Sequence, residues 1–134
     1  NKIVLQSSEF IPQKHKLEKC DDGVGNISVC KVDGYEVYGT DLDTPTYQLI
    51  SAYYINKGVN VKLDISGMFN PWSGIPDDTD FIIIQKKDGL LFIKGIFSDG
   101  AGAYFVMWEI KGNASKRVVI TKDESLLVKH FYED

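Results

Sequence analysis

Two acidic stretches carry the residue types that suit molecular recognition. Residues 38–45 read YGTDLDTP, and residues 66–80 read SGMFNPWSGIPDDTD. Aromatic anchors inside a charged rim are typical of protein–protein interfaces. We therefore predict a binding surface made of Tyr38, Asp41, Asp43, Phe69, Trp72, Asp77, Asp78 and Asp80.

The aromatic residues of the second stretch also admit another interpretation. Met68, Phe69 and Trp72 can instead fold into one end of the hydrophobic core, which leaves the aspartates as solvated surface charges. An exposed Trp72 beside the aspartates would favour the binding surface. A buried Trp72 would favour the core.

Catalytic chemistry has little support in the sequence. The histidines His15 and His130 lie outside any nucleophile motif such as G-x-S-x-G. A glycosidase needs two convergent carboxylates, for which the candidates are Asp41, Asp43, Asp64 and Asp80. We expect no catalytic residue, and a hydrolase is the less favoured alternative.

Metal and cofactor sites are not expected either. The histidines and cysteines lack the spacing of zinc ligands. The aspartates of 41–43 and 77–80 offer oxygen ligands for calcium, but they do not match an EF-hand loop. The glycine-rich 99–103 stretch lacks the helix and lysine of a phosphate-binding loop. A calcium-binding or small-ligand-binding module remains the alternative to a protein-binding function.

Composition narrows the class of partner. The 134 residues suit one domain, and the net charge of −4 disfavours binding to nucleic acid. A protein partner with a basic surface, such as a toxin or a hydrolase, fits this charge better. No apolar run reaches the roughly 18 residues of a membrane span. The oligomeric state is not specified by these features.

Cys20 and Cys30 suggest a compartment. They flank a short stretch that contains Gly23 and Gly25, so we predict a disulfide that closes a small loop. Two reduced thiols in a cytosolic core are the alternative. Because disulfides persist in oxidising compartments, we expect a periplasmic or secreted protein. The chain begins without methionine, as a processed protein would.

Turn residues between apolar runs predict antiparallel strands. Asp33-Gly34 separates the strands of a hairpin over 27–39, and Asn56-Lys57-Gly58 separates those of a second over 46–64. In the second hairpin, Val59, Val61, Leu63 and Ile65 alternate as one inward face. A meander follows, with strands at 81–85, 90–97, 104–111 and 116–121.

The two ends of the chain are less regular. Thr121 to Glu124 fits a capping box, and an apolar stripe then predicts a short C-terminal helix through Leu126, Leu127, His130 and Phe131. Near the N-terminus, Ile3 to Leu5 can start a strand, whereas Pro12 and the charged stretch at 14–19 suggest a loop or an edge.

These elements predict a single mainly β domain over residues 1–134. We expect an antiparallel β-sandwich or partly open barrel of about eight strands, with the short C-terminal helix. Both acidic stretches follow the second strand of an early hairpin. They therefore lie at the same end of the sheet if the strands alternate in direction.

The order VYGTD…TP…QLISAYY…KLDISGMFNPW resembles small exported bacterial proteins of poorly assigned function, over roughly residues 28–74. In these proteins a G-T-D turn precedes a strand pair that ends in S-G-M-[FY]-N-P-W. The resemblance implies a periplasmic or secreted bacterial protein and brings no catalytic residues. Small acidic exported β-proteins include inhibitors and immunity proteins, which occlude a toxin or a cell-wall-degrading enzyme. We expect a function of this kind.

Overall fold

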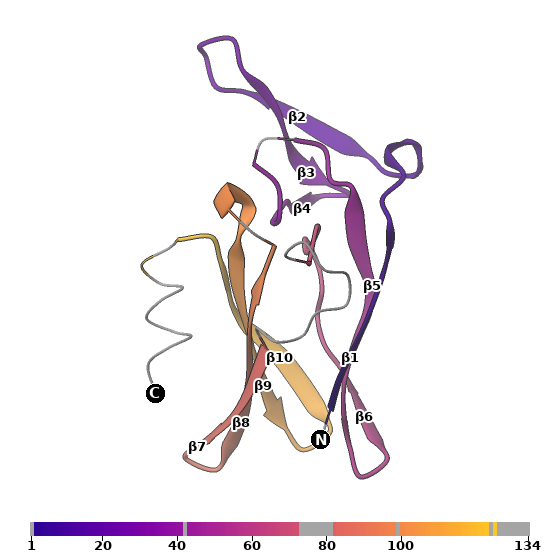
Figure 1. The fold of residues 1–134 in the computed structure, drawn as a ribbon, viewed down its shortest axis with the longest axis vertical. Coiled ribbons are helices and arrows are strands. Elements are labelled where there is room, and N and C mark those ends of the chain that lie inside the picture. Colours follow the sequence, from indigo (N-terminus) through magenta and orange to yellow (C-terminus); the bar gives the residue numbers. More distant parts are fainter. Residues whose placement is uncertain (1, 42, 73–81, 99, 124, 126–134) are drawn as a thin grey trace.

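The computed structural model describes residues 2–41, 43–72, 82–98, 100–123 and 125. Within these residues the chain forms ten strands and two short 3-10 helices (Figure 1). In chain order they are β1 (Lys2–Glu9), η1 (Pro12–Lys14), β2 (Leu17–Asp21), β3 (Ile27–Val32), β4 (Tyr35–Glu36), β5 (Tyr47–Asn56), β6 (Val59–Lys62), β7 (Ile82–Lys87), β8 (Leu90–Phe97), η2 (Gly100–Gly102), β9 (Tyr104–Lys111) and β10 (Ala114–Thr121).

The strands make three antiparallel sheets, in the orders β1-β5-β6, β2-β3-β4 and β10-β9-β8-β7. The mainly β, antiparallel prediction is therefore confirmed, and the described strands do not close into a barrel. The described residues form ten strands where the sequence predicts about eight, and the two additional strands are β1 and β2. β2 is an exposed, charged strand, and β1 pairs with β5 through an irregularity between Gln6 and Ser7.

Three hairpin turns lie where the sequence predicts them. Asp33-Gly34, Lys57-Gly58 and Asp88-Gly89 all have two consecutive residues with positive φ, between 49° and 85°. Such turns match the right-handed twist of paired strands, so they fix the register of each hairpin locally.

Val59, however, is 47% exposed and does not join the predicted inward face. It pairs with Asn56 beside the turn, away from the core.

The larger hydrophobic core lies between the β1-β5-β6 sheet and the four-stranded sheet. It contains buried residues from both, including Ala52 and Tyr54 of β5 and Tyr104 and Trp108 of β9. Phe97 stacks on Tyr104 with ring centroids 5.6 Å apart and meets Trp108 edge-on at 6.1 Å. Burying these aromatic side chains removes a large apolar area from water and so stabilises the body of the protein.

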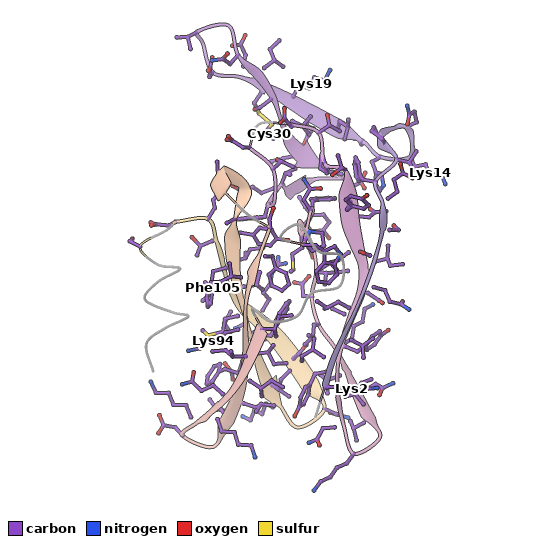
Figure 2. The ribbon with its side chains drawn as sticks, viewed as in Figure 1. Lys2, Lys14, Lys19, Cys30, Lys94 and Phe105 are labelled. Carbon is purple, nitrogen blue, oxygen red and sulfur yellow. A yellow bond between two sulfur atoms is a disulfide. The ribbon has the colours of Figure 1, made fainter. Side chains whose placement is uncertain are left out.

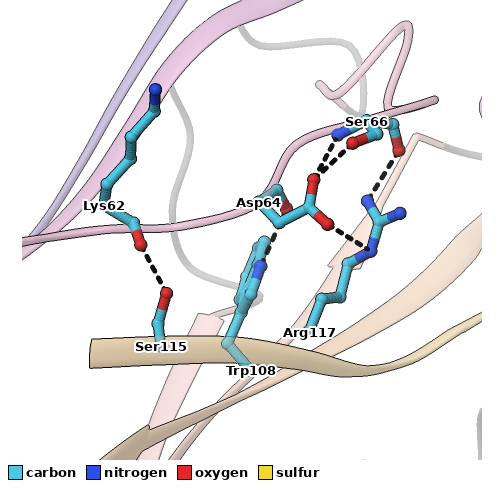
Figure 3. A network of polar contacts seen from close by, with 6 residues as sticks. All are labelled: Lys62, Asp64, Ser66, Trp108, Ser115 and Arg117. Carbon is cyan, nitrogen blue, oxygen red and sulfur yellow. Dashed lines mark hydrogen bonds and ion pairs between the residues drawn. The ribbon is translucent and has the colours of Figure 1, made fainter.

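A polar network joins the two layers where β6 ends (Figure 3). Arg117 of β10 donates a hydrogen bond from Nη1 to the Ser66 carbonyl at 2.6 Å, and its Nε lies 3.9 Å from Asp64 Oδ2. Trp108 Nε1 donates to the Asp64 carbonyl at 2.9 Å. Ser115 adds a hydrogen bond to the Lys62 carbonyl. The segment that leads into the second acidic stretch is thereby held on the four-stranded sheet.

The small β2-β3-β4 sheet covers a second core made of Phe10, Val29, Val32, Val37 and Phe69. Beside it, the ring of His15 stacks on Phe10 at 4.5 Å, and His15 Nδ1 lies 2.6 Å from Asp33 Oδ2. These contacts fasten the base of the β2–β3 hairpin, which extends away from the rest of the molecule in Figure 1.

The predicted disulfide is confirmed. Cys20 and Cys30 are bonded across β2 and β3, within the extended hairpin (Figure 2). At the hairpin tip, Asp22 Oδ1 accepts hydrogen bonds from the amides of Val24 at 2.8 Å and Asn26 at 3.1 Å. The tip is therefore ordered by its own contacts, although Val24 is 81% exposed.

No C-terminal helix is among the elements of the described residues. Its predicted apolar residues, Leu126, Leu127, His130 and Phe131, lie outside the described part of the chain. Just before them, Thr121 Oγ1 accepts a hydrogen bond from the Asp123 amide at 3.1 Å. None of the helices in the described ranges is long and apolar enough to cross a membrane.

Candidate binding cleft

The described parts of the two acidic stretches lie side by side, although the strands before them, β4 and β6, belong to different sheets. The Tyr38 amide donates to the Gly67 carbonyl at 2.9 Å, and the Phe69 amide donates to the Tyr38 carbonyl at 3.0 Å. Tyr38 and Met68 thus form an isolated parallel bridge outside the sheets. We call the contact between residues 38–40 and 67–71 the clasp.

Asn70 is the central side chain of the clasp. Its Oδ1 accepts three hydrogen bonds, from the Thr46 amide at 3.0 Å, Thr46 Oγ1 at 2.9 Å and the Tyr47 amide at 2.9 Å. Its Nδ2 donates to the Gly39 carbonyl at 3.1 Å. Asn70 also has a φ of 43°, a conformation that asparagine tolerates better than most residues. One side chain therefore ties together both acidic stretches and the start of β5.

Gly39 permits the close approach of the two stretches. A Cβ atom at this position would lie 1.9 Å from the Phe69 carbonyl oxygen, and φ is 104°. On its other side, Ser98 Oγ donates to the Gly39 carbonyl at 3.3 Å, and the Ser98 amide donates to the Pro71 carbonyl at 3.2 Å. The clasp is thus packed against the end of β8, and η2 lies beside it (Figure 1).

A cleft of about 620 Å³ opens next to the clasp. Its walls come from residues 39–41, 43 and 46–47, from residues 70–72, from residues 98 and 100–102, and from Ser7 of β1. This volume is within the range of sites that bind small molecules or a protruding side chain. Four separate segments build the cleft, so its shape depends on the clasp.

Three predicted residues line this cleft, namely Trp72, Asp41 and Asp43. Trp72 is neither fully buried nor fully exposed: it packs partly on the larger core and donates from Nε1 to Ser7 Oγ at 3.0 Å. That hydrogen bond and the core contact hold the indole ring in place. Asp41 and Asp43 are exposed at the same cleft. The aromatic and acidic groups of the predicted surface do meet here.

Phe69 does not face the cleft. It is 7% exposed and packs edge-on against Phe10 with ring centroids 5.5 Å apart, so for Phe69 the core interpretation holds. Met68 is likewise a core residue. The backbone of both residues takes part in the clasp, which directs their side chains inward.

Tyr38 is half-buried and, like Phe69, is not among the residues that line the cleft. Its ring packs against Tyr104 at 5.8 Å, and Lys122 Nζ lies 5.4 Å from the ring centroid. Its hydroxyl donates to Glu36 Oε2 at 3.3 Å. Burial, together with the negative charge of Glu36, raises the pKa of the Tyr38 hydroxyl. Tyr38 is therefore a neutral phenol that helps to hold the clasp.

The remaining predicted residues, Asp77, Asp78 and Asp80, lie outside the described residues. Sequence reasoning missed Gly39, Asn70, Tyr47, Ser98 and residues 100–102 as parts of the site. The signal for Gly39 and Asn70 was present, because each sits inside a G-T-D or N-P-W motif. The contribution of Ser7 and Ser98 had no local signal, since it depends on tertiary packing alone.

Some polar side chains of the cleft are already hydrogen-bonded within the protein, and others are not. Asn70, Thr46, Ser98 and Ser7 already take part in the hydrogen bonds given above. Within the described part of the chain, by contrast, no hydrogen bond or ion pair engages the carboxylates of Asp41 or Asp43. These two are also the charged groups among the described lining residues. Among the described lining residues, the charged groups without a partner are therefore carboxylates, and they share the cleft with the aromatic rings of Trp72 and Tyr47.

Two of the four carboxylates named as glycosidase candidates, Asp41 and Asp43, line the cleft, and no histidine is among its described lining residues. His15 lies at the base of the β2–β3 hairpin, where its hydrogen bond lowers the pKa of Asp33. His130 lies outside the described residues. The ranges that the structure describes contain no group of three or more His, Cys, Asp or Glu side chains that could hold a metal ion.

Comparison of the chain with protein-family models, with curated proteins and with solved structures finds no match.

Proposed function

We propose that this chain is a non-catalytic binding protein that recognises a protein partner through the cleft beside the clasp. The observation that carries the proposal is the meeting of Trp72, Asp41 and Asp43 in one cleft of about 620 Å³. A half-buried aromatic ring supplies apolar contact area, and carboxylates at the rim supply orientation and selectivity. In this proposal the protein acts by occlusion, as an inhibitor or immunity protein of a toxin or cell-wall-degrading enzyme does.

Charge supports a basic partner. The net charge of the chain is −4, which favours a positively charged partner. Asp41 and Asp43 place negative charge at the cleft itself and favour the same kind of partner. We propose that Asp77, Asp78 and Asp80 add to this field. Complementary charge mainly accelerates association and falls off with added salt, so the binding rate should depend on ionic strength.

The disulfide between Cys20 and Cys30 is compatible with an oxidising compartment. We propose a periplasmic or secreted location on this basis, in line with the resemblance to small exported bacterial proteins.

A small-ligand-binding module is the second candidate, and the volume of the cleft favours it. Calcium is one ligand of this kind, since Asp41 and Asp43 provide carboxylate oxygens. Calorimetric titration with calcium, together with the effect of a chelator on the melting temperature, separates this candidate from protein binding. A melting temperature that rises with calcium and falls with chelator would favour the module.

Capture from the periplasmic and extracellular fractions of the source organism tests the first proposal. The intact chain and the D41N/D43N double variant serve as baits, at low and at high salt. A matched control is the double variant E18Q/D88N, which removes the same charge from exposed positions on β2 and the β7–β8 turn. We expect a partner that the intact chain and the control retain and that D41N/D43N loses. Equal capture by all three baits would rule out the cleft as the binding site.

A further inference from the structure

We propose that the cleft is a receptor for the guanidinium group of an arginine side chain presented by the partner protein. This inference rests on the proposed function and names the chemical group that the cleft selects. It follows from the two kinds of group that the cleft leaves available, carboxylates and aromatic rings.

The carboxylates define the charge of the bound group. Asp41 and Asp43 both line the cleft, and each is exposed. Within the described part of the chain neither is engaged in an ion pair or hydrogen bond. An arginine side chain offers five N–H donors in a planar fork, which match carboxylate oxygens in pairs. A cationic group would gain the electrostatic attraction of both carboxylates, which a neutral group would not.

The aromatic rings favour a planar cation. Trp72 is held by its Nε1 hydrogen bond to Ser7 Oγ and by its contact with the core, so its ring does not need to be ordered on binding. Tyr47, which is 52% exposed, lines the same cleft. A guanidinium stacks on such rings and is less strongly hydrated than an ammonium group. Arginine should therefore bind in preference to lysine.

The other polar groups argue against a ligand recognised mainly through hydroxyls. Asn70 Oδ1 accepts three hydrogen bonds and Nδ2 donates one, all at the clasp or the start of β5, and the hydroxyls of Thr46 and Ser98 donate within the protein. Among the lining hydroxyls, those of Thr40 and Tyr47 take part in no hydrogen bond within the described residues, and a sugar would need more such groups. The volume of about 620 Å³ also leaves room for the backbone that flanks an arginine.

The probes for a direct test are the N-acetyl N-methylamides of arginine, lysine and citrulline. Citrulline has nearly the shape of arginine but no charge. The readout is the indole N–H resonance of Trp72 in an NMR titration, with Trp108 as the internal reference because it is fully buried in the larger core. We expect saturable movement of the Trp72 resonance with the arginine probe. The intact chain should bind the lysine and citrulline probes at least roughly fivefold more weakly than the arginine probe. The D41N/D43N variant should bind the arginine probe more weakly than the intact chain by a similar factor.

Two outcomes would overturn the inference: equal binding of citrulline or lysine, or no movement of the Trp72 resonance with any probe. An unchanged Trp108 resonance in D41N/D43N shows that the variant is folded. The E18Q/D88N control should bind the arginine probe as the intact chain does. If partner capture depends on Asp41 and Asp43 while arginine fails to bind, the guanidinium inference is wrong and the proposed function stands. If capture does not depend on them, the proposed function itself is wrong.

Discussion

The side-chain amide of Asn70 donates a hydrogen bond to the carbonyl of Gly39 at 3.1 Å, and the two residues are 31 positions apart in the chain. Because the same side chain also accepts three hydrogen bonds from Thr46 and Tyr47, it connects two of the loop segments that line the candidate cleft with the start of β5.

Replacing Asn70 with aspartate should therefore open the clasp. Aspartate has no N–H to donate to Gly39, and its negative charge would face that carbonyl. We expect the free energy of unfolding to fall by about 1–3 kcal/mol, measured by urea denaturation. The control is N60D on β6, an exposed position away from the clasp. Equal stability of N70D and N60D would contradict the assigned role of Asn70.

Replacing Gly39 with alanine should be more damaging. The added Cβ would lie 1.9 Å from the Phe69 carbonyl oxygen, so the clasp must move apart. We expect a loss of roughly 3 kcal/mol, together with loss of arginine binding at the cleft. Gly25 is a matched control, because its φ is also positive, at 94°, but nothing lies within 4 Å of a Cβ there. G25A should cost only about 1 kcal/mol. Similar costs for both variants would show that backbone conformation, not contact with Phe69, decides the effect.

Removing the disulfide should weaken the extended hairpin and spare the cleft. The bond closes a loop with a sequence separation of 10, for which loop entropy gives roughly 2–3 kcal/mol. The C20S/C30S variant should therefore unfold at lower urea, with amide protection lost first in β2 and β3. Its affinity for the arginine probe should be unchanged. In the intact chain, alkylation without reductant should add no mass, and two added groups would contradict the disulfide.

Stability should also fall in acid, in part through Asp64. Burial acts to raise the pKa of Asp64, but hydrogen bonds from Ser66 and the charge of Arg117 outweigh it, so the pKa is lowered from 3.8. A carboxyl with a lowered pKa stabilises the folded state above its unfolded pKa. That contribution is lost as the pH falls below 3.8 through the folded pKa.

The variant D64N isolates this effect. It should be less stable than the intact chain at pH 7, and the difference should shrink as the pH is lowered toward 2 in urea denaturation series. Asp22 and Asp33 also have lowered pKa values, so the D64N curve should keep part of the acid dependence. D88N, on the β7–β8 turn, is the control. A D64N difference that is constant with pH would contradict the assignment.

Local chemistry explains why much of the fold could be predicted. The Asp33-Gly34 and Asp88-Gly89 turns are determined by the conformations of their own residues, and the apolar runs beside them follow directly. The polar run Gln6 to Ser8 has neither turn residues nor an apolar pattern that would predict a strand. It becomes part of β1 because β5 pairs with it, and this depends on tertiary structure.

The same distinction separates the predicted and missed parts of the site. Trp72, Asp41 and Asp43 were recognised by residue type. Phe69 and Trp72 look alike in sequence, yet Phe69 is in the core and Trp72 lines the cleft, because packing around the clasp decides which way each ring faces. Asn70 was missed because its role lies in hydrogen bonds to residues far away in the chain.

The tip of the β2–β3 hairpin has a practical consequence. The Cys20–Cys30 disulfide and the hydrogen bonds of Asp22 hold the tip in place. Val24, at the end of the tip, belongs to neither hydrophobic core. Residue 24 is therefore a suitable attachment point for a fluorophore or an immobilisation tag. A protein tethered there would be attached through a residue that does not line the cleft, which makes the hairpin suitable for surface-based binding measurements.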